Sequence, residues 1–299
     1  MKTKITPLLT ITLVLALPLL MGAQSRRPRL STNVNVDRGN VTDCRDLRVQ
    51  FDRRPAITEE TEMILPPSQV SALRAQTDNS GIYVSGWDRN ESSVKTCKAV
   101  PDSDPNASAT LREINTTNTN GQLSVTGPRD REWVANLIIM VPRLSTLDLQ
   151  TRNGPLQLRD LAGNIHLSAS NGPISLANVG GSVQAATTNG PISVKGGSGD
   201  QQLSATNGPI RVGLSGTRWD GPGLQVSTRN GPLALSIPET YDSGIAIQVS
   251  GRSPVSCTAG ACSGAIRSPG SPNIIRIGNG DPIVRLSTMN GPLSVRNDN

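Results

Sequence analysis

Aromatic residues are scarce in this chain, which has one Phe, two Tyr and three Trp among 299 residues. Large rings fill a good part of most globular cores, and Tyr and Trp also supply the exposed rings on which sugars commonly stack. The scarcity therefore argues against a conventional globular core and against a sugar site built from stacked rings.

Histidine is rarer still, because His166 is the only one. A serine or cysteine nucleophile needs a positioned base, which is most often a histidine. His166 stands in a pattern position that is otherwise polar, so we interpret it as a surface residue. We predict no catalytic residue, no cofactor and no metal site, since the turns also lack the recurring Asp of calcium-binding repeats.

The chain has four cysteines, Cys44, Cys97, Cys257 and Cys262. An even number in an exported chain indicates two disulfides, and four cysteines allow three pairings. We favour Cys44–Cys97 and Cys257–Cys262, because each pair stays within one region of the chain. A zinc site is the alternative for the second pair, but no His or further Cys pair stands close to it in sequence.

The first 23 residues have the pattern of a secretory signal peptide. Lys2 and Lys4 precede an apolar run over residues 8–17, and small residues then allow cleavage after Ala23 or Ser25. The run is shorter than the roughly 20 residues that span a bilayer. We therefore expect an exported chain without a transmembrane anchor after cleavage, located in the periplasm, on the cell surface or in the medium.

A basic arm, Arg26-Arg27-Pro28-Arg29, would begin the mature chain. Such an arm suits anionic envelope polymers or lipid headgroups, and a solvated tail is the alternative. We expect no nucleic-acid partner in this compartment.

The strongest pattern is a repeated Asn-Gly-Pro tripeptide. It occurs six times; the first four copies are 18 residues apart, and the next two gaps are 23 and 60 residues. The Asn-Gly pairs, which we expect to form the repeat turns, are Asn153-Gly154, Asn171-Gly172, Asn189-Gly190, Asn207-Gly208, Asn230-Gly231 and Asn290-Gly291.

Aliphatic or small residues alternate with polar residues on both sides of each tripeptide, as in Val183-Gln184-Ala185 and Ile192-Ser193-Val194. This period of two is typical of half-buried strands. A unit this small cannot bury its own apolar face, but stacked units can. The pattern predicts an all-β, single-stranded β-solenoid with rungs of about 18 residues. A meander of hairpins is the alternative, but it would not need a constant register.

The chain divides into two parts beyond the signal peptide. Residues 26–113 are more charged and strand-rich, and we predict that they cap the solenoid. Residues 114–295 form the repeat domain, whose 60-residue gap we interpret as degenerate rungs around a Cys257–Cys262 loop. The last rung ends at Val295, and we predict that its unpaired strand edge docks on a partner or on another copy.

One stretch of the repeat domain resembles a known family. Val141-Pro142, the run from Leu147 to Gly154, and the repeated Asn-Gly-Pro-Ile/Leu units that follow are similar to the bacterial "putative adhesin" β-strand-repeat family, a domain of unknown function. The resemblance covers about residues 114–295. It implies an envelope or surface protein with a β-solenoid fold and brings no functional residues. The long disulfide-bearing N-terminal region departs from the family pattern.

Irregular features on a rigid scaffold are the natural candidates for ligand contacts. Here they are Trp87, Trp219 and Tyr241, although the two tryptophans could instead cap the core. We predict a non-enzymatic adhesion or interaction module whose partner is an envelope polysaccharide or a surface protein.

Two other functions stay open at this point. One is a purely structural envelope protein without a ligand. The other is a polysaccharide-active enzyme, which would need two carboxylates about 5–10 Å apart. The few acids of the repeats, Asp148, Asp160, Asp200 and Asp220, do not share one strand column.

Overall fold

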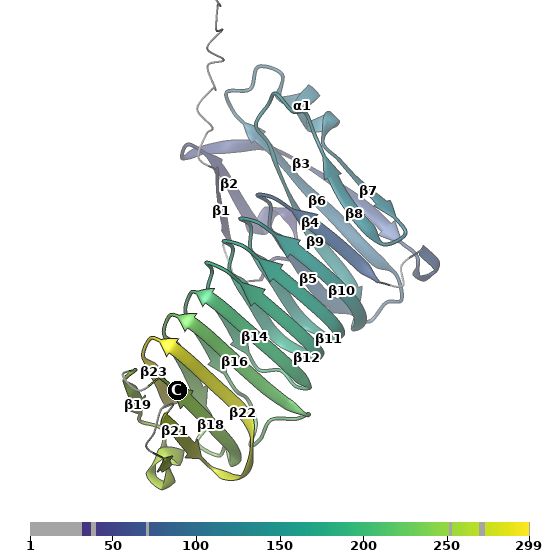
Figure 1. Ribbon diagram of the computed structural model, residues 1–299. Coiled ribbons are helices and arrows are strands. Elements are labelled where there is room, and N and C mark those ends of the chain that lie inside the picture. Colours follow the sequence, from purple (N-terminus) through teal and green to yellow (C-terminus); the bar gives the residue numbers. More distant parts are fainter. Residues whose placement is uncertain (1–31, 37–39, 70–71, 251–252, 269–272, 299) are drawn as a thin grey trace, which may run out of the picture.

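A computed structural model describes residues 32–36, 40–69, 72–250, 253–268 and 273–298. The predicted signal peptide and basic arm lie outside these residues. Strands make up 63% of these residues and helices 7%, so the described part of the protein is all-β, and its strands link into an open sheet (Figure 1).

The strands of the N-terminal part are β1 (Thr32–Val36), β2 (Leu47–Phe51), β3 (Arg54–Leu65), β4 (Leu73–Thr77), β5 (Ile82–Trp87), β6 (Ser92–Pro101), β7 (Asn115–Thr119), β8 (Gln122–Thr126) and β9 (Val134–Pro142). The helix α1 (Ala107–Glu113) and the 3-10 helices η1 (Cys44–Asp46) and η2 (Pro67–Gln69) belong to the same part.

The strands of the repeat part are β10 (Leu144–Thr151), β11 (Leu156–Ala169), β12 (Ile174–Thr187), β13 (Ile192–Lys195), β14 (Asp200–Asn207), β15 (Ile210–Gly213), β16 (Gly223–Asn230) and β17 (Leu233–Ile237). They are followed by β18 (Ser243–Val249), β19 (Val255–Cys257), η3 (Gly260–Gly264), β20 (Ile266–Ser268), β21 (Asn273–Ile277), β22 (Asn279–Asn290) and β23 (Leu293–Asn297).

Successive repeats pair in parallel with the 18-residue offset of the sequence. Leu156 stands opposite Ile174, Ile165 opposite Val183, and Ile192 opposite Ile210. Equivalent residues of neighbouring repeats are therefore direct neighbours across the strands. This register is the one that the repeated columns predict.

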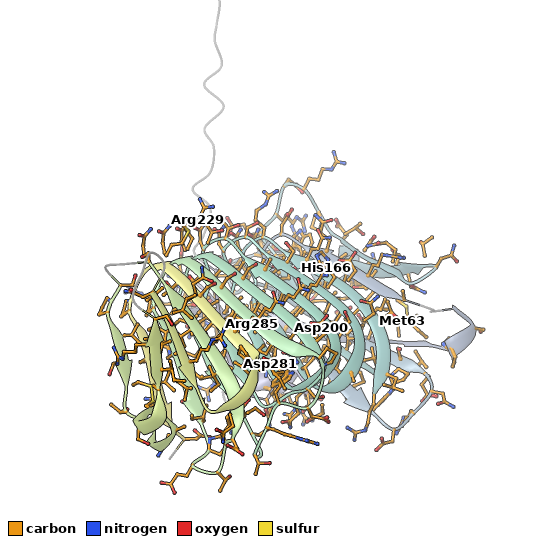
Figure 2. All side chains as sticks on the ribbon, turned by 60° about the horizontal axis from the view of Figure 1, so that its bottom comes forward. Met63, His166, Asp200, Arg229, Asp281 and Arg285 are labelled. Carbon is orange, nitrogen blue, oxygen red and sulfur yellow. A yellow bond between two sulfur atoms is a disulfide. The ribbon has the colours of Figure 1, made fainter. Side chains whose placement is uncertain are left out.

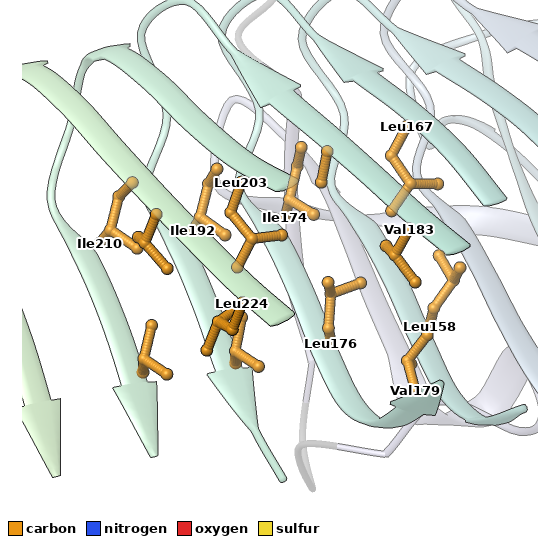
Figure 3. Close-up of a cluster of buried hydrophobic side chains, with 14 of the residues drawn as sticks. Leu158, Leu167, Ile174, Leu176, Val179, Val183, Ile192, Leu203, Ile210 and Leu224 are labelled. Carbon is orange, nitrogen blue, oxygen red and sulfur yellow. The ribbon is translucent and has the colours of Figure 1, made fainter. Parts of the chain in front are cut away.

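The strands form two stacks that face each other across the core. The first stack holds the strand before each Asn-Gly-Pro, and the second holds the strand after it. Figure 3 shows the buried side chains between them, with Leu167, Val183 and Leu203 from the first stack and Ile174 and Ile192 from the second. Each of these side chains is at most 1% exposed, and burying one stabilises the fold by roughly 1.5–3 kcal/mol.

Contacts between neighbouring Asn-Gly-Pro corners explain why Asn and Gly occupy these positions. Asn171 donates its side-chain amide to Oδ1 of Asn153 at 2.8 Å, so the asparagines form a ladder along one corner of the stacks. A Cβ on Gly172 would lie 1.9 Å from the carbonyl oxygen of Gly154, a distance that no side chain tolerates. Glycine is required here because the backbones of adjacent corners approach too closely for a side chain.

The order of the strands in space differs from their order along the chain. The β22–β23 pair lies between β16–β17 on one side and β18–β19 on the other. The predicted C-terminal docking edge is therefore wrong, because the strand that ends the repeat is paired along both edges. Likewise, β4 and β5 lie between β8–β9 and β10–β11.

The 60-residue gap also differs from the prediction of degenerate rungs. Its first strands, β18 and β19, pair in parallel with β22 and β23, as rungs would. However, β21 pairs antiparallel with β18, and β20 pairs antiparallel with β21. This segment is therefore a rung followed by a hairpin that covers the end of the first stack.

The disulfide predictions are confirmed. Cys44 is bonded to Cys97 with a Cα–Cα distance of 5.4 Å, and Cys257 is bonded to Cys262 with a Cα–Cα distance of 5.9 Å. The first bond ties η1 to β6, and the second closes the short loop between β19 and η3. The free-thiol ligands that zinc would need are therefore not available at Cys257 and Cys262.

Candidate binding groove

A groove of about 900 Å³ runs along the outer face of the first stack. Its floor crosses β11, β12, β14, β16, β22 and β18, and the hairpin strand β21 and the segment Asp281-Pro282 line its end. Figure 2 shows these strands side by side, with His166 and Arg285 labelled along them.

One line of polar side chains spans the groove, and we call it the polar column. Its members stand directly opposite one another on adjacent strands. They are His166, Gln184, Gln202, Gln225 and Arg285.

Strand alternation points these side chains outward. Gln184 is exposed, whereas its neighbours Val183 and Ala185 are 0% and 2% exposed and face the core. Because parallel strands lie about 4.8 Å apart, the column presents one polar group at each such step. A second line of small residues, which includes Ser204 and Ser227, runs beside it and keeps the groove open.

The chemistry of the column is hydrogen bonding. A Gln amide offers two donors and one acceptor oxygen, so it can bind hydroxyl and carbonyl groups alike. None of the three Gln side chains of the column makes a hydrogen bond within the described part of the protein. They are therefore available for a ligand.

His166 contacts one acid at the far end of the column. Its Nδ1 lies 3.2 Å from Oδ1 of Asp148, which precedes it in the same line on β10. The His166 side chain is 52% exposed and that of Asp148 38% exposed. Both side chains are partly exposed to solvent, so we interpret the pair as a polar surface contact.

The structure corrects two of the three predicted ligand contacts. Trp219 and Tyr241 are each 4% exposed and belong to the main core cluster. The indole N–H of Trp219 donates to the carbonyl oxygen of Gly199 at 2.8 Å, which satisfies it internally. These residues close the core where the 23-residue and 60-residue gaps interrupt the repeat, so they cannot contact a surface ligand.

Trp87 is half-buried and lies outside the groove. Its indole N–H donates to the carbonyl oxygen of Glu91 at 2.8 Å, and the guanidinium of Arg89 lies 4.8 Å from its ring centroid. The structure leaves one ring partly accessible there, while no Phe, Tyr or Trp lines the groove itself.

One acid of the repeat is held at a corner by hydrogen bonds. Asp160 lies at a corner with φ 54° and accepts hydrogen bonds from Asn178 and Arg159, which hold the pKa of its carboxyl below the usual value. Within the described ranges, no group of three or more His, Cys, Asp or Glu side chains is placed to hold a metal ion. The helices of the same ranges include none that is long and apolar enough to cross a membrane.

Comparisons with known proteins found solved structures that align with this chain, but no matching sequence. No family model matches the chain, and no curated protein sequence is similar to it. Its fold aligns with a "putative cell adhesion protein" from Clostridium sporogenes at 13% identity and a TM-score of 0.34, over 81% of this chain and 100% of that one.

Two further solved structures bear a similar name. They are a "putative adhesin" from Bacteroides fragilis (9% identity, TM-score 0.37) and another from Parabacteroides distasonis (8% identity, TM-score 0.36), each aligned over 81% of this chain and 97% of its own. These names agree with the family that the Asn-Gly-Pro repeat resembles.

Proposed function

We propose that this protein is a non-enzymatic adhesion or interaction module of the bacterial cell envelope or surface, and that it holds its ligand in the groove over the polar column. The observation that carries this proposal is the unbroken line of outward, unpaired amides of Gln184, Gln202 and Gln225 along a 900 Å³ groove.

The scaffold that supports the column is a β-solenoid in this proposal. The parallel pairing of equivalent residues over successive repeats supports it. In the same proposal, residues 26–113 cap the solenoid and residues 114–295 form its repeat domain. Two disulfides favour a location outside the cytoplasm, in agreement with removal of residues 1–23 on export.

The ligand class that suits such a column is an extended polysaccharide of the envelope. A sugar chain presents hydroxyl groups at regular intervals, and a row of Gln amides can both donate to them and accept from them. Because no Phe, Tyr or Trp lines the groove, hydrogen bonds would have to provide the contact that ring stacking provides elsewhere.

The experiment is a retention assay with the oxidised mature chain on isolated cell envelopes, peptidoglycan and a panel of immobilised polysaccharides. The test variant is Gln184→Ala/Gln202→Ala/Gln225→Ala. The control is Ser193→Ala/Arg211→Ala, which changes two exposed residues of the opposite stack. Saturable retention that the column variant loses and the control keeps supports the proposal.

Two results would count against it. If none of the materials retains the wild-type protein, the chain is better explained as a purely structural envelope protein. If the column variant is retained to the same extent as the wild type, a ligand exists but its site lies elsewhere.

A further inference from the structure

Two arginines flank one alanine at the C-terminal end of the groove. Ala246 of β18 stands opposite Arg285 of β22 on one side and opposite Arg276 of β21 on the other. Residues that are directly opposite project to the same face of a sheet, so both arginines project to the face of the polar column.

Only an alanine stands between the two arginines across the strands. Adjacent strands lie about 4.8 Å apart, so the two arginine backbones are about 10 Å apart with Ala246 between them. Both arginines are exposed, and Ala246 contributes only a methyl group. The long arginine side chains can therefore converge above Ala246 on a single group that enters the groove.

The charges at this end are unbalanced. No ion pair of the described residues includes Arg276 or Arg285. Asp281 also lines the groove at this end, whereas Asp148 lies beside His166 at the other end. Two cations facing a single carboxylate leave net positive charge, which attracts an anion.

We propose that Arg276 and Arg285 form an anion site over Ala246 that binds an acidic group of a polysaccharide lying along the groove. This inference rests on the proposed function and narrows its ligand to an acidic polymer. The planar fork of a guanidinium matches a carboxylate or a sulfate with two parallel hydrogen bonds, which a Gln amide does not match.

The test measures binding of the full oxidised chain to three soluble polymers. Polygalacturonate carries carboxylates, dextran sulfate carries sulfates, and dextran is neutral. The variant Arg276→Gln/Arg285→Gln removes both cations. The variant Arg211→Gln/Arg218→Gln removes the same charge from exposed positions outside the groove and is the matched control. Circular dichroism confirms that each variant is folded.

The expected result is that the wild type binds at least one acidic polymer more tightly than dextran. The groove variant should then bind that polymer about tenfold more weakly or worse, which corresponds to about 1.4 kcal/mol, and the control should stay within about twofold of wild type. Preference for polygalacturonate over dextran sulfate, or the reverse, identifies the acidic group. Ala246→Leu should weaken binding in the same direction, because it fills the space between the arginines without changing the charge.

Three results would overturn the inference. Equal loss in the groove variant and the control would show attraction to the net charge of the protein alone. Equal binding of dextran and the acidic polymers, unaffected by the groove variant, would remove the anion site but leave the polysaccharide groove in place. Binding of none of the polymers or envelope fractions by the wild type would remove the proposed function and this inference together.

Discussion

The side-chain amide of Asn189 donates a hydrogen bond to Oδ1 of Asn171 at 2.9 Å, although the two residues are 18 positions apart in sequence. The bond is one step of a ladder that continues through Asn207 and Asn230 to Asn290, with distances of 2.8–3.0 Å. Each asparagine uses its NH₂ group toward one neighbour and its oxygen toward the other, so the repeats are tied together at their corners.

Asn189→Ala should therefore destabilise the protein by about 1–2 kcal/mol, because it removes two hydrogen bonds of the ladder at once. Urea denaturation followed by circular dichroism measures the change. Asn164→Ala is the control, since Asn164 is exposed on β11 outside the ladder. An equal effect of the two substitutions would show that the ladder adds nothing to stability.

Gly190→Ala should be more damaging than the asparagine change. Its new Cβ would lie 2.1 Å from the carbonyl oxygen of Gly172, and a clash with backbone cannot be relieved by a side-chain rotation. We expect a loss of about 3 kcal/mol or more. Gly264→Ala is the control, because nothing lies within 4 Å of the Cβ it would add. A melting temperature of Gly190→Ala equal to that of the control would contradict the close approach of adjacent corners.

The two disulfides should differ in how much they stabilise the fold. Cys44–Cys97 closes a loop of 53 residues, whereas Cys257–Cys262 closes one of 5. The loop-entropy model gives about 4 kcal/mol for the first bond and about 2 kcal/mol for the second. Urea unfolding of Cys44→Ser/Cys97→Ser and of Cys257→Ser/Cys262→Ser tests this order. A larger loss in the second variant would show that local packing, and not chain entropy, decides the effect.

The stability that Asp43 contributes beside the Cys44–Cys97 disulfide should depend on pH. The pKa of Asp43 is held well below its usual value, first because the Arg45 side chain donates to it at 2.8 Å, and also through the Arg45 backbone N–H and Lys95. A depressed folded pKa adds stability above the unfolded pKa of about 3.9, and that stability is lost as the pH falls toward the folded pKa.

Asp43→Ala should thus cost about 1 kcal/mol at pH 7, where the ionised carboxylate also caps η1, and clearly less at pH 3. Denaturation curves at both pH values measure the difference, with Asp102→Ala as an exposed control. A cost that is the same at pH 3 as at pH 7 would show that the ionised form of Asp43 is not what stabilises the fold.

The repeat register and the disulfide pairs could be predicted because both follow from local spacing. The period of 18 places Val183 inward and Gln184 outward, and it also identifies the line that contains His166 and Arg285. It does not give the order of strands in space, since a strand with the right alternation fits next to any rung. For that reason the insertion of β22 between β16 and β18 was missed.

The repeat alignment likewise predicts only part of the candidate site. Arg276 lies on an antiparallel strand, so an alignment on Asn-Gly-Pro cannot place it beside Ala246. Asn79 begins the asparagine ladder with a bond from Asn153 at 2.7 Å, but no Gly-Pro follows it in sequence. The burial of Trp219 depends on how its loop folds back to Gly199, which no spacing rule contains.

The most direct test of the binding account observes the Gln side chains themselves. In a ¹⁵N NMR titration with oligogalacturonate, the side-chain NH₂ signals of Gln184, Gln202 and Gln225 should shift in a saturable way. The NH₂ signals of Asn171, Asn189 and Asn207 should stay in place, because those groups are already bonded within the ladder at the corner. Saturable shifts that leave the three Gln signals unchanged and fall elsewhere on the protein would contradict the proposed site.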